Sequence, residues 1–186
     1  MGLLGLIRRG RHERAGFELY AAAVAAAREP FFYTTLGVPD TLDGRFDMVG
    51  LYAFLVIQRL KRELPPGPVL AQAVFDAMFS DMDVNLREMG AGDLSVGRKV
   101  RAMWEAFHGR AAAYASALGA DDTIALDAAL LRNVWRGKFP PDGSLEGLRG
   151  IVLSQSAHLA AQGLTGLVHG VVDFLPAEEA NCRPLS

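Results

Sequence analysis

One segment of this chain is apolar on almost every side of a helix. Over residues 47–64 the polar residues gather at the two ends, and the apolar side chains between them are Met48, Val49, Leu51, Tyr52, Phe54, Leu55, Val56 and Ile57. A helix on a protein surface keeps one polar face, whereas a helix that is apolar all round is buried. We therefore expect this helix at the centre of the fold, with Asp47 capping its start and Phe46 packed against Leu51.

The rest of the chain also shows helical spacing, and strand alternation is hard to find. Apolar periodicity, with Gly and Pro as breakers, predicts a loop over 31–45 and further helices over 13–29, 68–80, 81–89, 95–118, 121–139, 145–162 and 164–175. Because the connections are short, consecutive helices should pack as antiparallel neighbours. The sequence predicts an all-α, single-domain bundle of about six to eight helices around the buried helix near 47–64.

Length and charge suggest how the chain is divided. With 186 residues, of which 51% are hydrophobic, the chain can bury a sizeable core as one domain. Residues 1–14 hold four arginines against one glutamate, a net charge of +3, although the whole chain carries −2. We expect a flexible basic leader over 1–14, a helical domain over 15–176 and a polar C-terminal tail over 177–186. A contact between the leader and an anionic membrane surface is the alternative for this segment.

Several classes of protein are disfavoured. The single cysteine, Cys182, excludes an internal disulfide framework and fits a reducing compartment. The most apolar run, 48–57, is half the length of about twenty residues that a membrane span needs. The overall acidic balance argues against specific nucleic-acid binding. We expect a cytoplasmic protein, either free or held peripherally at the inner face of the cytoplasmic membrane.

Motifs for catalysis and metal binding fail on inspection. The segment 81–92 opens like a calcium loop, but Leu86 replaces the required glycine and Gly92 the bidentate glutamate. The stretch 92–99 lacks the Lys and Ser or Thr that a phosphate-binding loop needs after its second glycine. The four histidines do not have the spacing of metal ligands. We expect no enzymatic activity, no metal and no cofactor on this chain.

One enzyme class remains as an alternative. All-helical prenyl-transfer enzymes hold magnesium on aspartate-rich turns, and the candidate acids here are Asp76, Asp81, Asp83, Asp121 and Asp122. The last two lack the third aspartate of such a turn, and helix capping explains them more simply. A metal-dependent enzyme for an isoprenoid-like substrate would need these carboxylates around one cavity.

The helix over 95–118 is the best candidate for a binding surface. It places Arg98, Arg101 and His108 opposite an apolar stripe that includes Trp104 and Phe107. Arginine is favoured at interfaces because its planar fork pairs bidentately and stacks on aromatic rings. A solvated charged face is the alternative. The candidate partner-binding residues are Phe46, Tyr52, Arg98, Arg101, Trp104, His108 and Arg110, with Phe46 and Tyr52 supporting a groove or the core.

Two blocks of sequence resemble the ubiquinol–cytochrome c chaperone family. The first is the loop 36–47 followed by the apolar helix that ends in Gln58-Arg59-Leu60-Lys61. The second comprises Asp81-x-Asp83, Leu86-Arg87-Glu88-Met89-Gly90, Asp93-x-x-Val96-Gly97-x-Lys99-Val100, and Gly109-Arg110 to Tyr114. Together the blocks cover about residues 16–136.

This resemblance implies an assembly factor that binds newly made cytochrome b and supports biogenesis of the ubiquinol–cytochrome c reductase complex. The short leader resembles that of bacterial-type members of the family. Mitochondrial members work with a small partner subunit near the ribosomal exit, so the ribosome or a membrane surface are further candidate contacts. The family has no catalytic residues to carry over, and haem is expected on the client rather than on this chain.

Overall fold

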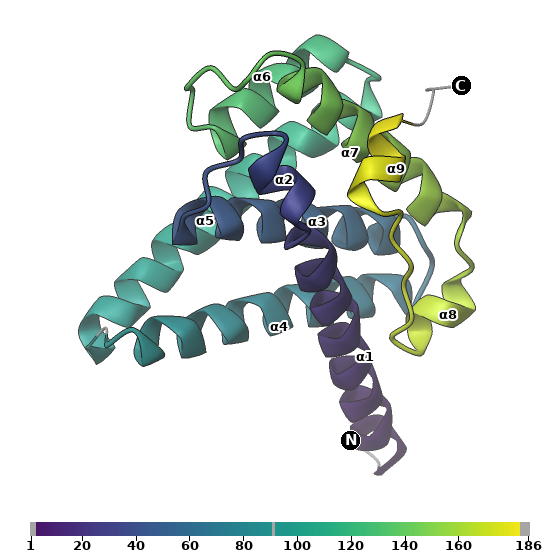
Figure 1. Ribbon diagram of the computed structural model, residues 1–186. Helices are drawn as coiled ribbons and strands as arrows, with labels where there is room; N and C mark the ends of the chain where they lie inside the picture. The colour runs from purple at the N-terminus through teal and green to yellow at the C-terminus, as the bar shows by residue number, and fades with distance from the viewer. Residues whose placement is uncertain (1–2, 91, 183–186) are drawn as a thin grey trace.

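The apolar segment forms the central helix of the computed structural model, which describes residues 3–90 and 92–182 (Figure 1). This helix, α3, runs from Leu42 to Lys61, and every residue from Met48 to Ile57 in it is buried. Its first turn is capped by Thr41, whose side chain accepts a hydrogen bond from the Gly44 N–H at 3.1 Å. The prediction of a central buried helix is confirmed, but the predicted Asp47 cap is wrong because the cap, Thr41, lies six residues earlier.

The part of the chain that the structure describes contains nine α-helices and no strand. Their bounds are α1 Leu3–Ala27, α2 Pro30–Thr34, α3 Leu42–Lys61, α4 Gly67–Glu88, α5 Asp93–Gly119, α6 Thr123–Val134, α7 Ser144–Ala161, α8 Leu164–Val168 and α9 Ala177–Cys182. The predicted all-α, single-domain bundle is confirmed. Within these described residues, we find no helix with the length and apolar content needed to cross a membrane.

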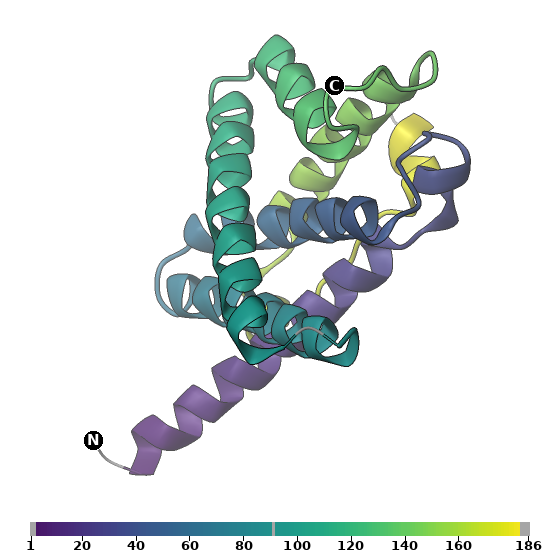
Figure 2. The ribbon, with the colours of Figure 1, turned by 90° about the vertical axis from the view of Figure 1, so that its left-hand side faces the viewer.

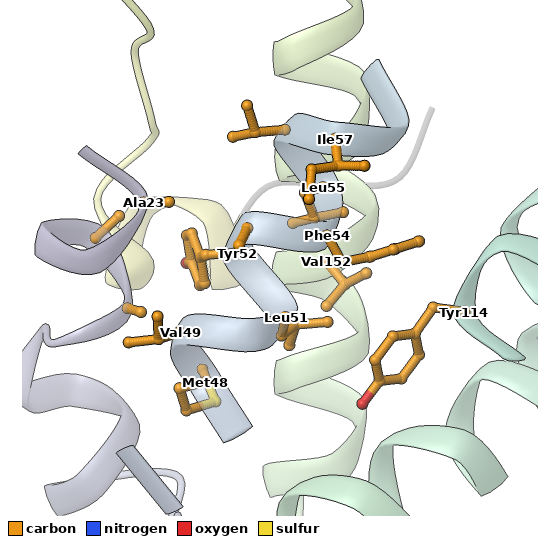
Figure 3. Close-up of a cluster of buried hydrophobic side chains, with 14 of the residues drawn as sticks. Ala23, Met48, Val49, Leu51, Tyr52, Phe54, Leu55, Ile57, Tyr114 and Val152 are labelled. Atoms are coloured by element: carbon orange, nitrogen blue, oxygen red, sulfur yellow. The ribbon is translucent and has the colours of Figure 1, made fainter. Parts of the chain in front are cut away.

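The longer helices are arranged around α3. Figures 1 and 2 show α4 on one side of α3 and α6 and α7 on the other, while α5 spans both levels and α1 crosses α4. Opposite faces of α3 therefore bury different side chains (Figure 3). Tyr52 points toward Ala23 of α1, whereas Phe54 points toward Tyr114 of α5, with ring centroids 5.5 Å apart.

Helices α1 and α4 cross with almost no space between their backbones. A Cβ atom placed on Gly16 of α1 would lie 2.5 Å from the Cβ of Ala73 and 2.7 Å from its carbonyl carbon. Near this crossing, the Tyr20 hydroxyl of α1 donates a hydrogen bond to the Asp81 carboxylate of α4 at 2.7 Å. The absence of a side chain at Gly16 is therefore what permits this close packing.

Replacing Gly16 by valine is expected to lower the free energy of unfolding by about 2 kcal/mol, because the added atoms must push α1 away from α4. Urea denaturation followed by circular dichroism measures the change. Gly109→Ala is the matched control, since Gly109 lies inside α5 and its Cβ would meet no atom within 4 Å. That control should raise stability by about 0.5–1 kcal/mol. Equal losses in both variants would contradict the packing argument.

Several helix boundaries differ from the sequence prediction. α1 begins at Leu3 rather than at residue 13, so most of the predicted leader is helical. α4 continues without a break through residues 80–81, because Met82 and Leu86 extend the buried stripe of Leu70, Val74 and Met78 at steps of four. α8 ends at Val168 instead of continuing to 175, and Gly170 follows with φ of 80°.

The segment after Gly170 is fastened by side chains from earlier in the chain. The fully buried Gln155 side chain donates to the Leu175 carbonyl at 2.7 Å and accepts from the Leu175 N–H at 3.1 Å. The Ala177 N–H then donates to the Glu29 carboxylate at 2.9 Å. Ala177 and Ala180 of α9 are buried, so the beginning of the predicted polar tail packs against the domain.

Candidate functional site

Aromatic side chains of α4 and α5 form a cluster where these helices meet. The ring centroid of Phe75 on α4 lies 4.6 Å from that of Phe79, 5.7 Å from that of Phe107 and 5.3 Å from that of His108. Trp104 stacks on His108 with centroids 4.0 Å apart and 33° between the ring planes. Tilted and edge-on contacts of this kind are favoured for aromatic rings. We call these five residues the aromatic cluster.

A groove of about 580 Å³ opens beside this cluster, between α3, α4 and α5. Its wall is mostly apolar, with Phe54 and Ile57 contributed by α3. On α5 the small residues Ala111, Ala112 and Ala115 line it. Trp104 borders the groove with 45% of its surface exposed. We call this feature the aromatic groove.

The rim of the aromatic groove is positively charged. Lys61 and Arg62, at the end of α3, both line it, and none of the described residues in its lining is acidic. Neither cation forms an ion pair with another described residue. A low-dielectric cleft with charge of one sign concentrates its electric field. The groove therefore favours an apolar ligand that carries negative charge at one end.

His108 has a defined tautomer in this site. Its Nδ1 lies 3.0 Å from the Trp104 carbonyl oxygen. Because a carbonyl only accepts hydrogen bonds, this contact favours the tautomer with a proton on Nδ1, which leaves Nε2 as the acceptor. Nε2 has no hydrogen-bond partner in the described part of the chain, so it can accept one from a ligand.

The structure brings two of the predicted site residues together, Trp104 and His108. His108 was expected on the face of the helix opposite the apolar stripe, but its ring packs on Phe75 and Phe107 instead. The reason is that α4 crosses α5 on this side and supplies Phe75, a contact that the spacing within one helix does not contain. A role for either residue in binding a partner stays a prediction.

Most of the other predicted site residues lie outside the aromatic groove. Arg98 and Arg101 are exposed on α5 before Trp104, and Arg101 pairs with Glu105 at 3.1 Å. Phe46 is half-buried against the core. Tyr52 is buried among other aromatic rings. Its ring centroid lies 5.8 Å from that of Phe32 and 5.2 Å from that of Phe174. The arrangement suits Phe46 and Tyr52 to core support, which was one of their two expected roles.

Arg110, the remaining predicted site residue, belongs to an ion cluster around the buried Asp47. The Asp47 side chain on α3 is 1% exposed and accepts hydrogen bonds from Arg110 and, at 3.0 Å, from Arg136. Asp43 lies 3.5 Å from the same Arg136. Burial raises the pKa of Asp47, and the two guanidinium groups oppose that rise. Arg110 thus ties α5 to α3.

The carboxylates of the alternative enzyme prediction are used for other contacts. Asp83 pairs with Arg87 at 2.5 Å on α4, and Asp122 caps α6 by accepting from the Ala125 N–H at 2.9 Å. Asp81 accepts from Tyr20. Among the described residues, no group of three or more histidine, cysteine, aspartate or glutamate side chains is placed to hold a metal ion. Asp76 and Asp81 line one groove between α1 and α4, but Asp83, Asp121 and Asp122 do not line it, so the five carboxylates do not surround one cavity as the alternative requires.

Comparison with known proteins gives consistent results. A family model described as ubiquinol-cytochrome C chaperone matches residues 34–174. The chain is 26% identical over 172 residues to ubiquinol-cytochrome-c reductase complex assembly factor 1 of Xenopus laevis, covering 92% of this chain and 86% of that protein. The crystal structure of the Cbp3 homolog from Brucella abortus matches with a TM-score of 0.82 and 35% identity, over 96% of this chain and 99% of that chain.

The all-α fold and the family match thus place the chain among assembly chaperones. The chain belongs to the ubiquinol–cytochrome c chaperone family. The match extends beyond the region around 16–136 in which the sequence blocks could be recognised, and it includes α7 and α8.

Proposed function

We propose that this protein is a non-catalytic chaperone that binds newly made cytochrome b during biogenesis of the ubiquinol–cytochrome c reductase complex. Membership of the family and the name of the amphibian relative support the assembly role. The structural observation that carries the proposal is the aromatic groove, with Trp104 partly exposed at its border. Cytochrome b is the client implied by the resemblance in the sequence.

The aromatic groove suits an apolar helix of a membrane protein. An amphipathic or apolar helix binds a hydrophobic groove by laying one face along its floor, and the alanines of α5 leave room for that approach. Tryptophan is enriched among the interface residues that contribute most to affinity. A client helix held in this way keeps its apolar side chains out of water until the complex assembles.

The charged rim suggests how the client helix is oriented. The C-terminal end of a helix carries partial negative charge, which cations stabilise. Lys61 and Arg62 line the aromatic groove at the C-terminal end of α3. We infer that the C-terminal end of the bound helix, or acidic residues close to it, lies beside these two side chains.

Replacing both rim cations, Lys61→Glu with Arg62→Glu, is expected to weaken client binding about tenfold, since attraction becomes repulsion at the rim. Binding of the unmodified protein should weaken as salt rises, and this dependence should diminish in the variant. Co-purification of cytochrome b at several salt concentrations measures both effects. Arg132→Glu with Lys138→Glu is the control, because it changes the charge equally outside the groove. Equal losses in both variants would contradict a local role for the rim.

The assembly function itself is tested by deleting the gene in a respiring host. The expected result is less assembled ubiquinol–cytochrome c reductase with unchanged levels of unrelated terminal oxidases. Restoring the protein should restore the complex, and affinity purification should recover cytochrome b with it. Normal levels of the complex after deletion would refute the proposed function.

A further inference from the structure

A second groove, of about 800 Å³, lies between α1 and α4. Its lining includes Phe17 of α1, which is 58% exposed, and Val69 and Val84 of α4, which are about half exposed. Three large apolar side chains left open to water in one groove suggest a surface that another polypeptide covers.

The charge of this groove is opposite to that of the aromatic groove. Glu13, Asp76 and Asp81 line it, and its described lining contains neither lysine nor arginine. The carboxylates are held in place, because Asp81 accepts from Tyr20 at 2.7 Å and Asp76 accepts from the Gln72 amide at 2.7 Å. We call this feature the acidic groove. It fits a segment with both apolar and cationic side chains.

The chain itself contains a segment of that kind. The N-terminal turns of α1 project beyond the rest of the molecule in both views (Figures 1 and 2). Their sequence joins Leu3, Leu4, Leu6 and Ile7 to Arg8, Arg9 and Arg11. Because residues 3–27 form one continuous helix, these turns run away from the groove that their own α1 lines from His12 onward. They can reach such a groove only on a second molecule.

We propose that the acidic groove binds the N-terminal turns of α1 from a second copy of this chain. Two copies then form a two-fold symmetric dimer by exchanging these turns. The same helix lines the groove with Glu13 and Phe17 and continues directly into the projecting turns. Groove and turns are therefore neighbours, so a two-fold axis lets both contacts form at once. The dimer covers Phe17, Val69 and Val84 and places arginines beside carboxylates.

A charge exchange between two variants of the full chain tests this dimer. The first variant, Arg8→Glu with Arg9→Glu, has acidic turns and an acidic groove. The second, Asp76→Arg with Ser80→Arg, keeps the basic turns and removes the net negative charge of the groove, because the two new arginines balance Glu13 and Asp81. Sedimentation velocity should show dimers for the unmodified protein and at least a tenfold weaker association for each variant alone. The equimolar mixture should form heterodimers, because the basic turns of the second variant meet the acidic groove of the first, and the acidic turns of the first meet the two new arginines of the second.

Two controls make the result decisive. Circular dichroism confirms that each variant is folded, and Asp142→Arg with Glu178→Arg changes exposed acids outside the acidic groove, so it should leave the dimer intact. A monomer at about 100 µM unmodified protein, or a mixture that stays monomeric, would overturn the proposal. Flotation with anionic vesicles tests the remaining outcome. If the unmodified protein is monomeric and binds the vesicles, and the first variant does not bind them, the turns contact a membrane surface instead of a second copy.

Discussion

Replacing Trp104 by alanine is expected to weaken capture of the client about thirtyfold while the chain stays folded. A buried aromatic anchor at an interface contributes about 2 kcal/mol or more, which corresponds to this factor. In the free protein Trp104 is 45% exposed and contacts mainly His108 and the groove wall, so its removal costs the fold little. The measurement is the amount of cytochrome b that co-purifies with each variant at equal expression.

Phe139→Ala provides the matched control for this experiment. Phe139 is also aromatic but 95% exposed, and it lies outside the aromatic groove. Its removal should change neither client capture nor stability by a measurable amount. If Trp104→Ala captures the client as well as the unmodified protein does, the aromatic groove is not the client site.

Replacing Arg110 by alanine should lower the free energy of unfolding by about 3 kcal/mol, because the buried Asp47 carboxylate loses one of its two guanidinium partners. Urea denaturation at neutral pH measures this loss. The control is Arg101→Ala, which removes an exposed pair with Glu105 and should cost less than about 1 kcal/mol. A small loss with normal folding would instead return Arg110 to the partner-binding role predicted from the sequence.

The loss of stability caused by Arg110→Ala should depend on pH. Burial already raises the pKa of Asp47, and removing a neighbouring cation raises it further. A carboxyl whose pKa is higher in the folded than in the unfolded state destabilises the fold when ionised, and this cost disappears as pH falls below the folded pKa. The difference between Arg110→Ala and the unmodified protein should therefore shrink toward pH 4. Adding Asp47→Asn to the variant should recover part of the stability at neutral pH.

The sequence was most informative about burial within single helices. Periodicity identified α3 as the central helix, because Met48 to Ile57 leave no polar face. It failed at helix ends, since the Thr41 cap and the continuation of α4 through Met82 depend on local hydrogen bonds and on what packs against the last turns. It also missed the stop after Val168, where the hydrogen bonds of Gln155 to Leu175 favour an extended segment.

The candidate site was predicted only in part. Trp104 and His108 were chosen from α5 alone, yet the groove also needs Phe54 of α3 and Phe75 of α4. Contacts between helices far apart in sequence are absent from the pattern of any one helix. One signal was available and misread: a single acid, Asp47, at the start of a wholly apolar stretch indicates a buried ion pair as readily as a helix cap.

The hydrogen bonds of Gln155 have a consequence for the order in which the protein folds during synthesis. Its partner Leu175 is made 20 residues later, and until then the Gln155 side chain can be buried only at the cost of leaving its amide without a hydrogen bond. The surfaces that Ala177 and Ala180 cover also remain exposed to solvent until α9 has been made. Domains generally fold as units during synthesis, so we expect this one to complete its core only after Leu175 has been made. We expect a chain that ends before Leu175 to leave this apolar surface exposed and to aggregate more readily than the full chain.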